Sequence, residues 1–513
     1  MTDFDFVVVG AGHNALTTAA YLAQAGYRVG IFERRNVIGG AVVTEEHVPG
    51  FRFDLGGSAH IMISHTPVVS DLGLERYGLE YINVDPLFFA PFPDGSHITV
   101  WKDVDKTCES IAAVSPEDAL AYRRFIDDWS MFAQKVVDAF LLPPTPKNLV
   151  DTLGTDSVDD PLRQLGPILG TYGQLVRRSF KSEKVRAVVA WMAAQSGPPP
   201  SEALSAAYAL LHPLYHLGGV RRPRGGSGML TQALGRMIED HGGQIFTGHP
   251  VTRILTQGGR AIGVETADGQ QATARHAVVS GAHIHTTLQL LGQTPPRSMD
   301  IGNGFGMIVR YAMNDLPNYN ALPSSDDGQP GPQHRAIQFI CPSLEYLDRS
   351  YQVFKQGRPS RDPALLSMTF SAVDPTLAPP GKHTLFLWGQ YYPYDLASGE
   401  HWDEIAQREA NRMLDTLAQY APNVKDAVID QLIETPLYLE RTLGLLRGNV
   451  MHLEMRVKQM FTLRPGLKLS HYRGPVDCLY LTGASTHPGG GIMGASGHNT
   501  AKVILADLDG VKA

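Results

Sequence analysis

The fold is decided by the stretch FDFVVVGAGHNA, residues 4–15. Its first six residues are mostly apolar and rich in valine, which predicts a short buried β-strand. The GxGxxA pattern that follows predicts a tight turn, a close approach of the backbone to a pyrophosphate, and a helix that packs against its own strand. The N–H groups at the start of that helix would point at phosphates. The residues expected to contact a dinucleotide here are Gly10, Gly12, His13, Asn14 and Ala15.

A second predicted strand, residues 28–32, places a carboxylate beside the same turn. Glu33 follows this strand and lies 21 positions after Gly12 (33 − 12). A carboxylate at this point can accept hydrogen bonds from a ribose, and it would repel a 2′-phosphate. Strand, helix, second strand and acid follow one another in the expected order. The sequence therefore predicts a Rossmann-type βαβ unit rather than an isolated glycine-rich turn.

Composition and charge narrow the class of protein. The chain has 513 residues, of which 43% are hydrophobic and 19% charged, and a net charge of −7. This length predicts two packed domains, and the acidic balance argues against a nucleic-acid partner. The three cysteines form no CxxC pair and no zinc quartet, which argues against disulfide-reductase chemistry and a metal site and favours a reducing, cytoplasmic setting. We expect neither a leader peptide nor a membrane span.

The C-terminal part of the chain holds a second glycine-rich passage. A predicted strand, residues 479–481, leads into TGASTHPGGGIMGASG, residues 482–497, and then into a predicted helix. Six glycines at such a passage let the backbone approach a large flat ligand, and the helix N-terminus offers positive potential. This geometry would stabilise negative charge on a reduced flavin. The contacts expected here are Gly483, Ala484, Gly491, Ile492 and Met493.

Taken together, these segments resemble the phytoene dehydrogenase-related family of FAD-dependent oxidoreductases. The resemblance is strongest to the branch similar to pyridine nucleotide-disulfide oxidoreductase domain-containing protein 2. It spans nearly the whole chain and rests on GHNAL (12–16), PGF (49–51), PRGGSGML (223–230), RPG (464–466) and the passage 482–497. The resemblance implies FAD as the cofactor.

The same resemblance gives a role to the residues that follow Glu33. In the extended fingerprint of these flavoproteins, a glycine pair near the pyrophosphate follows the acid; here the pair is Gly39 and Gly40. Many relatives carry Arg or Lys after the pair, whereas this chain has Ala41. A charge partner for the pyrophosphate must then come from elsewhere, and the candidates are Arg34 and Arg35.

The middle of the chain supplies the third piece of the cofactor domain. Residues 223–230 are predicted to open a helix, and short predicted strands follow up to residue 280. By the resemblance, the backbone of Val251 would meet the adenine, although an ordinary β-meander explains its side chain equally well. The neighbouring basic cluster, Arg221, Arg222 and Arg224, is interpreted as a local feature that could face a phosphate.

The predicted fold class is α/β, with a discontinuous Rossmann-type FAD-binding domain and an α+β substrate-binding domain. The first would comprise residues 1–64, 221–290 and 441–513, and the second residues 65–220 and 291–440. Apolar residues at helical spacing between 124 and 142 predict an amphipathic helix. We expect its apolar face to belong to the domain core, with peripheral contact to a membrane as the alternative.

Two histidines are the candidates for catalysis. His60 follows the first unit where related flavoproteins bring the chain past the flavin, and His487 lies beyond the last strand, where ligands of open α/β sheets gather. Each could transfer a proton, anchor a substrate or be a structural histidine. The family resemblance implies removal of hydride and a proton from adjacent carbons of an apolar or cyclic small molecule, with oxygen or a quinone as the electron acceptor. The alternatives are an amine oxidase, which an aromatic pair over the flavin would favour, and a non-catalytic FAD-binding protein.

Overall fold

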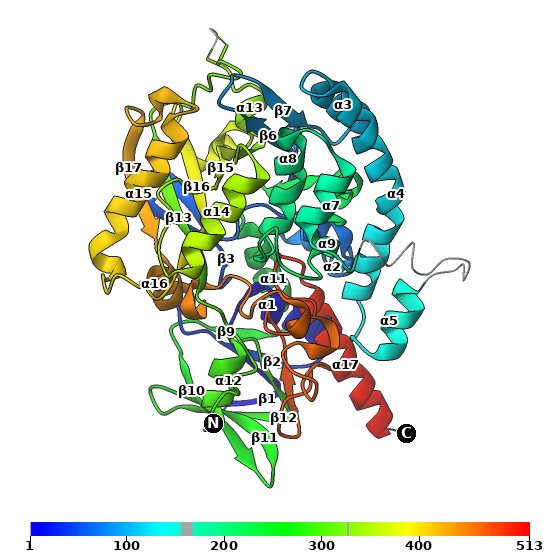
Figure 1. Ribbon diagram of the computed structural model, residues 1–513. Helices are drawn as coiled ribbons and strands as arrows, with labels where there is room; N and C mark the ends of the chain where they lie inside the picture. Colours follow the sequence, from blue (N-terminus) through cyan, green and yellow to red (C-terminus); the bar gives the residue numbers. More distant parts are fainter. Residues whose placement is uncertain (1, 155–167, 326–327, 513) are drawn as a thin grey trace.

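The computed structural model describes residues 2–154, 168–325 and 328–512. They form two layered units, each built on a seven-stranded sheet, and in Figure 1 the unit that contains the N-terminus lies below the other.

The first sheet is built on the predicted βαβ unit. Its strand β1 runs parallel to both neighbours, and Val8 pairs with Val279 on one side and Ile31 on the other. Parallel strands are buried on both faces, which explains the continuous run of valines. The order is β10 (Val251–Gln257), β11 (Arg260–Thr266), β12 (Gln271–Ser280), β1 (Thr2–Val9), β2 (Val29–Phe32) and β9 (Gln244–Phe246), with β18 (Leu479–Leu481) paired to β12.

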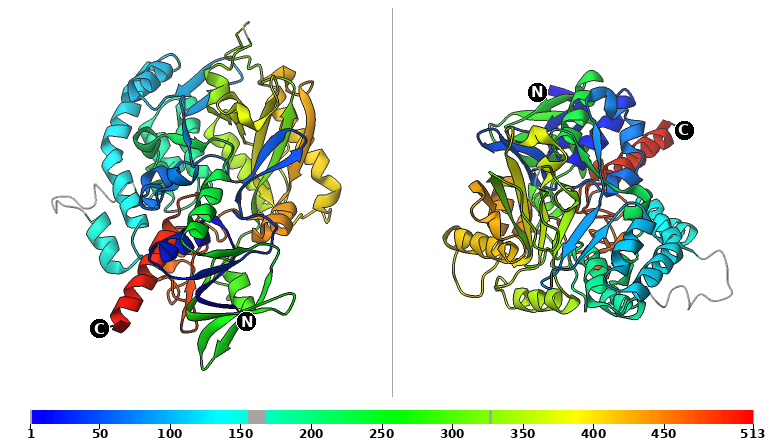
Figure 2. Two further views of the ribbon diagram at one scale, coloured as in Figure 1. Left: turned by 180° about the vertical axis from the view of Figure 1, so that it is seen from behind. Right: turned by 90° about the horizontal axis from the view of Figure 1, so that it is seen from above.

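Alternate residues of β1 serve the two faces of this sheet. Phe6 and Val8 pack against α1 (His13–Gln24) and α11 (Met229–Asp240), whereas Val7 packs beneath the β10–β11 meander. The C-terminal helix α17 (Ala495–Lys512) lies against α1 (Figures 1 and 2). Gly497 allows this contact, because a Cβ at that position would overlap the carbonyl oxygen of Asn14.

The second sheet separates two groups of helices, as the view from above in Figure 2 shows. One face packs on α15 (Trp402–Ala418), and the other packs on α4 (Pro116–Phe140), α7 (Tyr172–Ser179) and α8 (Glu183–Ala194). The strand order is β17 (Val428–Glu434), β13 (Gly304–Met313), β16 (His383–Pro393), β15 (Leu365–Met368), β14 (Ile337–Ile340), β6 (Phe88–Pro91) and β7 (His97–Val100).

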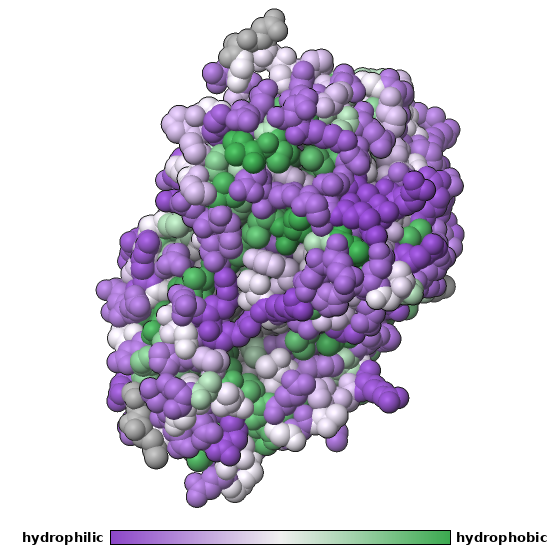
Figure 3. All heavy atoms as spheres, turned by 90° about the vertical axis from the view of Figure 1, so that its left-hand side faces the viewer, coloured by the Kyte–Doolittle hydropathy of each residue, from purple (hydrophilic) through white to green (hydrophobic). Residues whose placement is uncertain are grey.

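The helix predicted around residues 124–142 is α4, which begins earlier than expected. Its N-cap is Ser115, whose side chain accepts a hydrogen bond from the N–H of Asp118. Phe125 and Val136 are buried in the molecule, as the core interpretation requires, whereas Met131 is 70% exposed. No helix within the described ranges is long and apolar enough to cross a membrane. On the face that carries α15 and β17, hydrophobic side chains form separate patches among hydrophilic ones (Figure 3).

Smaller elements complete the two units. Two antiparallel ribbons are formed by β3 (Val42–Val48) with β4 (Phe51–Gly56) and by β5 (Tyr81–Val84) with β8 (Val220–Pro223). The remaining helices are α2 (Val68–Asp71), α3 (Val104–Ala112), α5 (Pro146–Leu153), α9 (Ala206–Ala209), α10 (Leu214–Gly218), α12 (Ile284–Leu290), α13 (Pro332–Arg335), α14 (Leu344–Lys355) and α16 (Pro436–Tyr438).

This architecture confirms the predicted α/β class with a Rossmann-type sheet and a second mixed sheet. The strands of the first sheet come from stretches 1–64, 221–290 and 441–513, and those of the second sheet from 65–220 and 291–440. The chain therefore crosses several times between the two sheets. The domain boundaries themselves remain a prediction.

Candidate functional site

A cavity of about 640 Å³ lies between the two units and takes its walls from both. We call its two parts the cofactor half and the substrate chamber. The cofactor half is lined by loops at the carboxyl ends of β1, β2, β12 and β18, where ligands of such sheets bind. The substrate chamber is lined by Phe140, Met192, Gln195, Ser196, Tyr208, Leu211, Leu214, Tyr215, Phe305, Ile337, Leu366, Met368, Phe386, Trp388 and Gln390.

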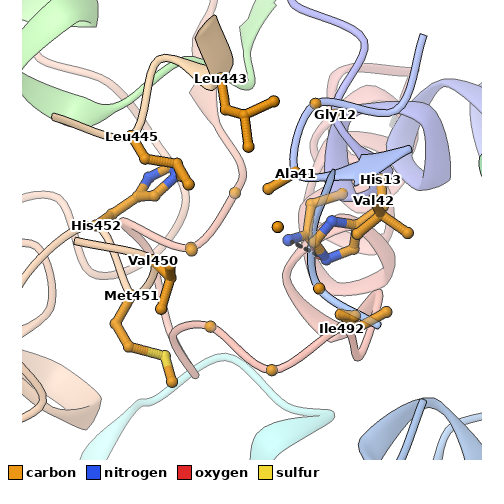
Figure 4. A pocket seen from close by; sticks show the side chains of 18 of the residues that line it. Gly12, His13, Ala41, Val42, Leu443, Leu445, Val450, Met451, His452 and Ile492 are labelled. Atoms are coloured by element: carbon orange, nitrogen blue, oxygen red, sulfur yellow. Dashed lines mark hydrogen bonds between the residues drawn. The ribbon is translucent and has the colours of Figure 1, made fainter. Parts of the chain in front are cut away.

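In the cofactor half, the turn at residues 10–12 meets the turn at Gly39–Gly40, and the glycines at this contact have no side chains. Gly12 forms a parallel bridge with Gly39, and the N–H of Gly39 donates to the carbonyl of Ala11 over 2.8 Å. Gly40 has φ of +60°, and a Cβ there would lie 3.1 Å from the Cα of Gly12. The glycine pair therefore has a structural reason, because a side chain would separate the two turns or fill the space between them and a ligand. Figure 4 shows Gly12 and Ala41 on this wall of the cavity.

Glu33 lies at the edge of the cofactor half and joins the turns together. One carboxylate oxygen accepts the N–H of Ala11 at 2.8 Å, and the other accepts the N–H of Arg35 at 2.9 Å. The side chain is buried yet lines the cavity, as does half-buried Val251. This is the end of the cavity at which the sequence predicted the ribose and adenine. Of the other predicted residues of the first turn, Gly10, His13, Asn14 and Ala15 also line the cavity.

The arginines proposed for the pyrophosphate are engaged elsewhere. The guanidinium of Arg34 donates to the carbonyl of Thr442 at 2.7 Å, and that of Arg35 forms an ion pair with Glu45 at 2.6 Å. Both arginines still border the cavity beside Glu33. The basic cluster does not face it: Arg222 pairs with Asp54 at 2.7 Å, and Arg224 pairs with Glu80. The cluster therefore fits the interpretation as a local feature, because local carboxylates neutralise the charges of Arg222 and Arg224, and none of its three arginines lines the cavity.

The C-terminal passage forms the floor of the cavity, as predicted. Ala484, Gly491, Ile492 and Met493 line it together with Gly483. Gly483 and Gly491 have φ of +100° and +125°, values that residues with side chains rarely adopt. The passage then enters α17 directly after Met493 and Gly494.

A fully buried arginine beneath this floor is a charged residue that we did not single out from the sequence. Arg464 is 0% exposed, and its guanidinium donates to five main-chain carbonyls, those of Met451, Leu453, Glu454, Gln459 and Ala484. No carboxylate of the described chain pairs with it. Burial lowers the pKa of Arg464 to about 10, so the group remains charged at neutral pH. A positive charge without a counter-charge is therefore held under the cavity, and an anion bound above it would be stabilised.

His452 and His283 form a second group that sequence reasoning missed. The two rings stack with centroids 4.9 Å apart, and His452 has φ of +65°. Ser485 accepts the N–H of Ile284 and has one further partner, Nδ1 of His452 at 2.9 Å. The hydroxyl therefore donates to Nδ1, which leaves Nε2–H of His452 as a donor beside the cavity. Burial, together with His283 and Arg464, lowers the pKa of His452 well below 6.5, so its ring is neutral at pH 7.

Neither histidine proposed for catalysis reaches the cavity. His60 is fully buried, with Nδ1 2.9 Å from the hydroxyl of Tyr81 and Nε2 2.8 Å from that of Ser227. Nε2 of His487 is 3.1 Å from the carbonyl of Ala139. Burial lowers the pKa of His60 to about 3 and that of His487 to about 4. Both therefore take the structural role that we kept as an alternative. Adjacent residues in the chain, such as Ile61 and Pro488, line the cavity in their place.

The loop Gly56–Ser58, on the wall between the two halves, is fixed by buried charge. Arg310 pairs with Glu434 at 2.8 Å and also donates to the carbonyl of Gly56 and the hydroxyl of Ser58. Arg222 donates to the carbonyl of Ser58. Because Arg310 belongs to the second sheet, it couples that sheet directly to the cofactor half.

The residues of the cofactor half fit a dinucleotide that carries a flavin. A cradle of glycines, one carboxylate at the ribose end, and a buried uncompensated cation under the floor match a ligand with a ribose, an anionic diphosphate and a flat ring. The residues that would hold FAD are those of the first turn, Glu33, the Gly39–Gly40 pair and the C-terminal floor. When bound, FAD supplies a two-electron acceptor.

Comparison with known proteins agrees with this geometry. The model of the family described as "Flavin containing amine oxidoreductase" matches residues 16–298, and that of the family "FAD dependent oxidoreductase" matches residues 171–432. The chain is 32% identical to pyridine nucleotide-disulfide oxidoreductase domain-containing protein 2 of Mus musculus, over 99% of this chain and 94% of the relative.

Other relatives and a solved structure complete the comparison. The chain is 30% identical to one of the subunits of limonene dehydrogenase from Castellaniella defragrans (98% of this chain, 95% of the relative) and 28% identical to phytoene dehydrogenase of Streptomyces griseus (95% and 92%). Its fold is similar to that of cyclohexylamine oxidase from Brevibacterium oxydans, with a TM-score of 0.59 at 17% identity, over 99% of this chain and all of that one. The chain belongs to the phytoene dehydrogenase-related family of FAD-dependent oxidoreductases.

Proposed function

We propose that the protein is an FAD-dependent CH–CH dehydrogenase, a desaturase, that acts on an apolar or cyclic small molecule. The observation that carries the proposal is that the apolar substrate chamber and the glycine-lined floor are parts of one cavity. A substrate in the chamber would therefore lie against a flavin on the floor, with water largely displaced by side chains such as Phe305, Leu366 and Phe386.

In the proposed reaction two adjacent substrate carbons would lose a hydride and a proton, which leaves a C=C bond. Bound FAD, held by the first turn, Glu33 and the C-terminal floor, would supply the hydride acceptor, and the proton would pass to water. The substrate gives up two electrons, and oxygen or a quinone would take them from the flavin afterwards. Among the described residues, the walls of the substrate chamber contain no histidine, aspartate or glutamate. The contribution of the chain is therefore to position the substrate and to exclude water, rather than to supply a base from these walls.

Two other functions are less well supported. An amine oxidase was expected to place an aromatic pair over the flavin. Near the floor, Figure 4 labels the aliphatic side chains of Leu443, Val450 and Ile492 and the imidazole rings of His13 and His452, but no Phe, Tyr or Trp. Apart from Phe32 at the end of β2, the Phe, Tyr and Trp side chains that line the cavity are those of the substrate chamber. A non-catalytic FAD-binding protein would have no need of a chamber beyond the cofactor half.

Anaerobic reduction tests the proposal. The purified FAD-loaded protein is mixed with candidate cyclic ketones, isoprenoids and amines in the absence of oxygen, and the flavin absorbance near 450 nm is followed. Bleaching by a ketone or isoprenoid, together with a product that has gained a C=C bond, is the expected result. Bleaching by amines alone would overturn the proposal in favour of the amine oxidase. A protein that binds FAD but is bleached by no compound would favour the binding function.

A further inference from the structure

The substrate chamber contains polar side chains of two kinds, which differ in whether the protein itself satisfies them. Nε1 of Trp388 donates to Oε1 of Gln390 at 2.8 Å, and Nε2 of Gln390 donates to the carbonyl of Ala194 at 2.9 Å. The hydroxyl of Tyr208 donates to the carbonyl of Met455 at 2.8 Å. These groups are committed to the protein and are not free to bind a ligand.

Gln195, Ser196 and Tyr215 are different. All three line the cavity and are partly exposed to it. Within the described chain, no hydrogen bond joins the amide of Gln195, the hydroxyl of Ser196 or the hydroxyl of Tyr215 to another residue. They are the unsatisfied polar groups of an otherwise apolar chamber. A pocket of that composition uses its few free polar groups to orient a ligand.

Their positions are fixed by packing. Gln195 caps the C-terminal end of α8, and the bond from Gln390 to Ala194 holds that end in place. Gly197 follows with φ of +107°, and a Cβ there would lie 2.8 Å from the ring of Phe305. On another wall, the ring of Tyr215 packs edge-on against Phe88 with centroids 4.9 Å apart. The free groups therefore belong to rigid elements, as a preorganised site requires.

We propose that the substrate carries a carbonyl or hydroxyl oxygen on its apolar framework, and that Gln195, Ser196 and Tyr215 bind this oxygen. The inference rests on the proposed function and narrows its substrates from apolar or cyclic small molecules in general to those that carry an oxygen. A hydrocarbon would cover these groups without replacing their bonds to water, and a buried polar group without a hydrogen bond is destabilising. Sites built to bind an oxygen therefore reject analogues that lack it.

The chemistry of the reaction agrees with an oxygen at this place. Burial raises the pKa of Tyr215 above its ordinary value of 10, so its hydroxyl stays protonated and can donate to a carbonyl. A carbonyl next to the C–H bond acidifies the proton that must leave, which compensates for walls that supply no base. Among the described residues, the walls of the substrate chamber carry no carboxylate that would pair with an ammonium group, although Glu33 and Glu440 line other parts of the cavity; an oxygen therefore fits the chamber better than a protonated amine.

Binding of matched compounds tests the inference. The FAD-loaded protein is titrated anaerobically with ketone and hydrocarbon pairs of one skeleton: cyclohexanone and cyclohexane, menthone and p-menthane, and 2-decanone and decane. Perturbation of the flavin spectrum gives the dissociation constant. We expect at least one ketone to bind about 10-fold or more tightly than its hydrocarbon. Tyr215→Phe and Gln195→Leu should each weaken that ketone about 5-fold or more and leave the hydrocarbon unchanged.

The control is Tyr392→Phe. Tyr392 does not line the cavity, and its buried hydroxyl has no hydrogen-bond partner within the described chain, so the variant removes a comparable hydroxyl away from the chamber. It should leave both dissociation constants unchanged. If no ketone binds more tightly than its hydrocarbon, or if Tyr215→Phe and Gln195→Leu leave the preference intact, the inference is overturned. Reduction of the flavin by hydrocarbons without any preference for ketones would overturn it while the proposed function stands. Tight and selective ketone binding without any reduction would overturn the proposed function and support the inference.

Discussion

The two halves of the cavity are built from different materials. The cofactor half is made of main chain: glycine turns, N–H groups and carbonyls, with Glu33 holding the turns at its edge and Arg464 holding the loops beneath its floor. The substrate chamber is made of side chains that come from α8, α10, β13, β15 and β16. A site made of main chain requires particular residue types at fixed spacing, whereas a site made of side chains accepts many combinations. The difference predicts that substitutions in the two halves will have separate effects.

The largest effect is expected at the meeting of the two turns. Gly40→Val should abolish retention of FAD, because residue 40 has φ of +60° and a Cβ there would lie 3.1 Å from Gly12. A non-glycine residue in this conformation also costs about 1–2 kcal/mol. The absorbance ratio at 450 and 280 nm of the purified protein measures the occupancy. Gly258→Val is the matched control, since Gly258 has φ of +59° with no atom within 4 Å of its Cβ position. If the Gly40→Val protein retained FAD fully, the view that the cofactor half depends on glycine main chain at this contact would be contradicted.

The next effect concerns the buried cation. Arg464→Met should destabilise the protein by about 3 kcal/mol and weaken FAD binding, because it leaves carbonyls without donors and removes the charge below the floor. Arg464→Lys keeps the positive charge but not the several N–H donors of the guanidinium. It should therefore also lose stability, but retain more of the FAD affinity than the Met variant. Urea unfolding and fluorescence titration with FAD measure the two quantities. Equal FAD affinity in both variants would show that packing, not charge, is what Arg464 provides.

A smaller effect follows from the histidines of the cofactor half. Burial lowers the pKa values of His13 and His283 to about 4, below the ordinary value of 6.5. Unfolding therefore takes up protons between these pH values, so stability is complete above pH 6.5 and falls as the pH is lowered towards 4. The loss is at most about 1.4 kcal/mol per pH unit for each histidine. Urea unfolding as a function of pH should give a flatter curve for His283→Asn, and an unchanged slope in that variant would contradict the assignment.

Substitutions in the substrate chamber are expected to have the smallest effect on FAD binding. Phe305→Leu should leave FAD content and the pH curve unchanged and alter the affinity for chamber ligands by about 1 kcal/mol or less, because it reshapes an apolar wall. The same flavin titrations measure this. Loss of FAD from this variant would mean that the two halves are not separable.

The residues of the cofactor half could be predicted from the sequence, whereas the direction of the histidine side chains and the polar groups of the chamber could not. Gly10, Glu33, Gly40 and Gly491 were found from motif spacing, and each lies on the cavity wall. His60 and His487 were placed in the right loops, but their side chains point into the protein. Position in a loop does not fix the direction of a side chain, because that depends on which partners the rest of the fold brings near.

The residues that were missed had a different cause. Arg464 belongs to the RPG step that the resemblance rested on, and that step was the one available signal. The sequence does not indicate that the five main-chain carbonyls which accept its hydrogen bonds come together from the loop at 451–459 and from Ala484. The free donors of the chamber, Gln195 and Tyr215, have no motif around them at all.

The sequence by itself determined the βαβ unit and the glycine-lined floor, because these depend on local backbone conformation and on spacing along the chain; FAD as the cofactor followed from the family resemblance. Only the tertiary structure decided which polar groups are satisfied and which are free. That distinction arises from contacts between residues far apart in the chain, such as Gln390 with Ala194 and Tyr208 with Met455. The cofactor-binding motifs were therefore readable from the sequence, whereas the proposal about the substrate rests on the fold.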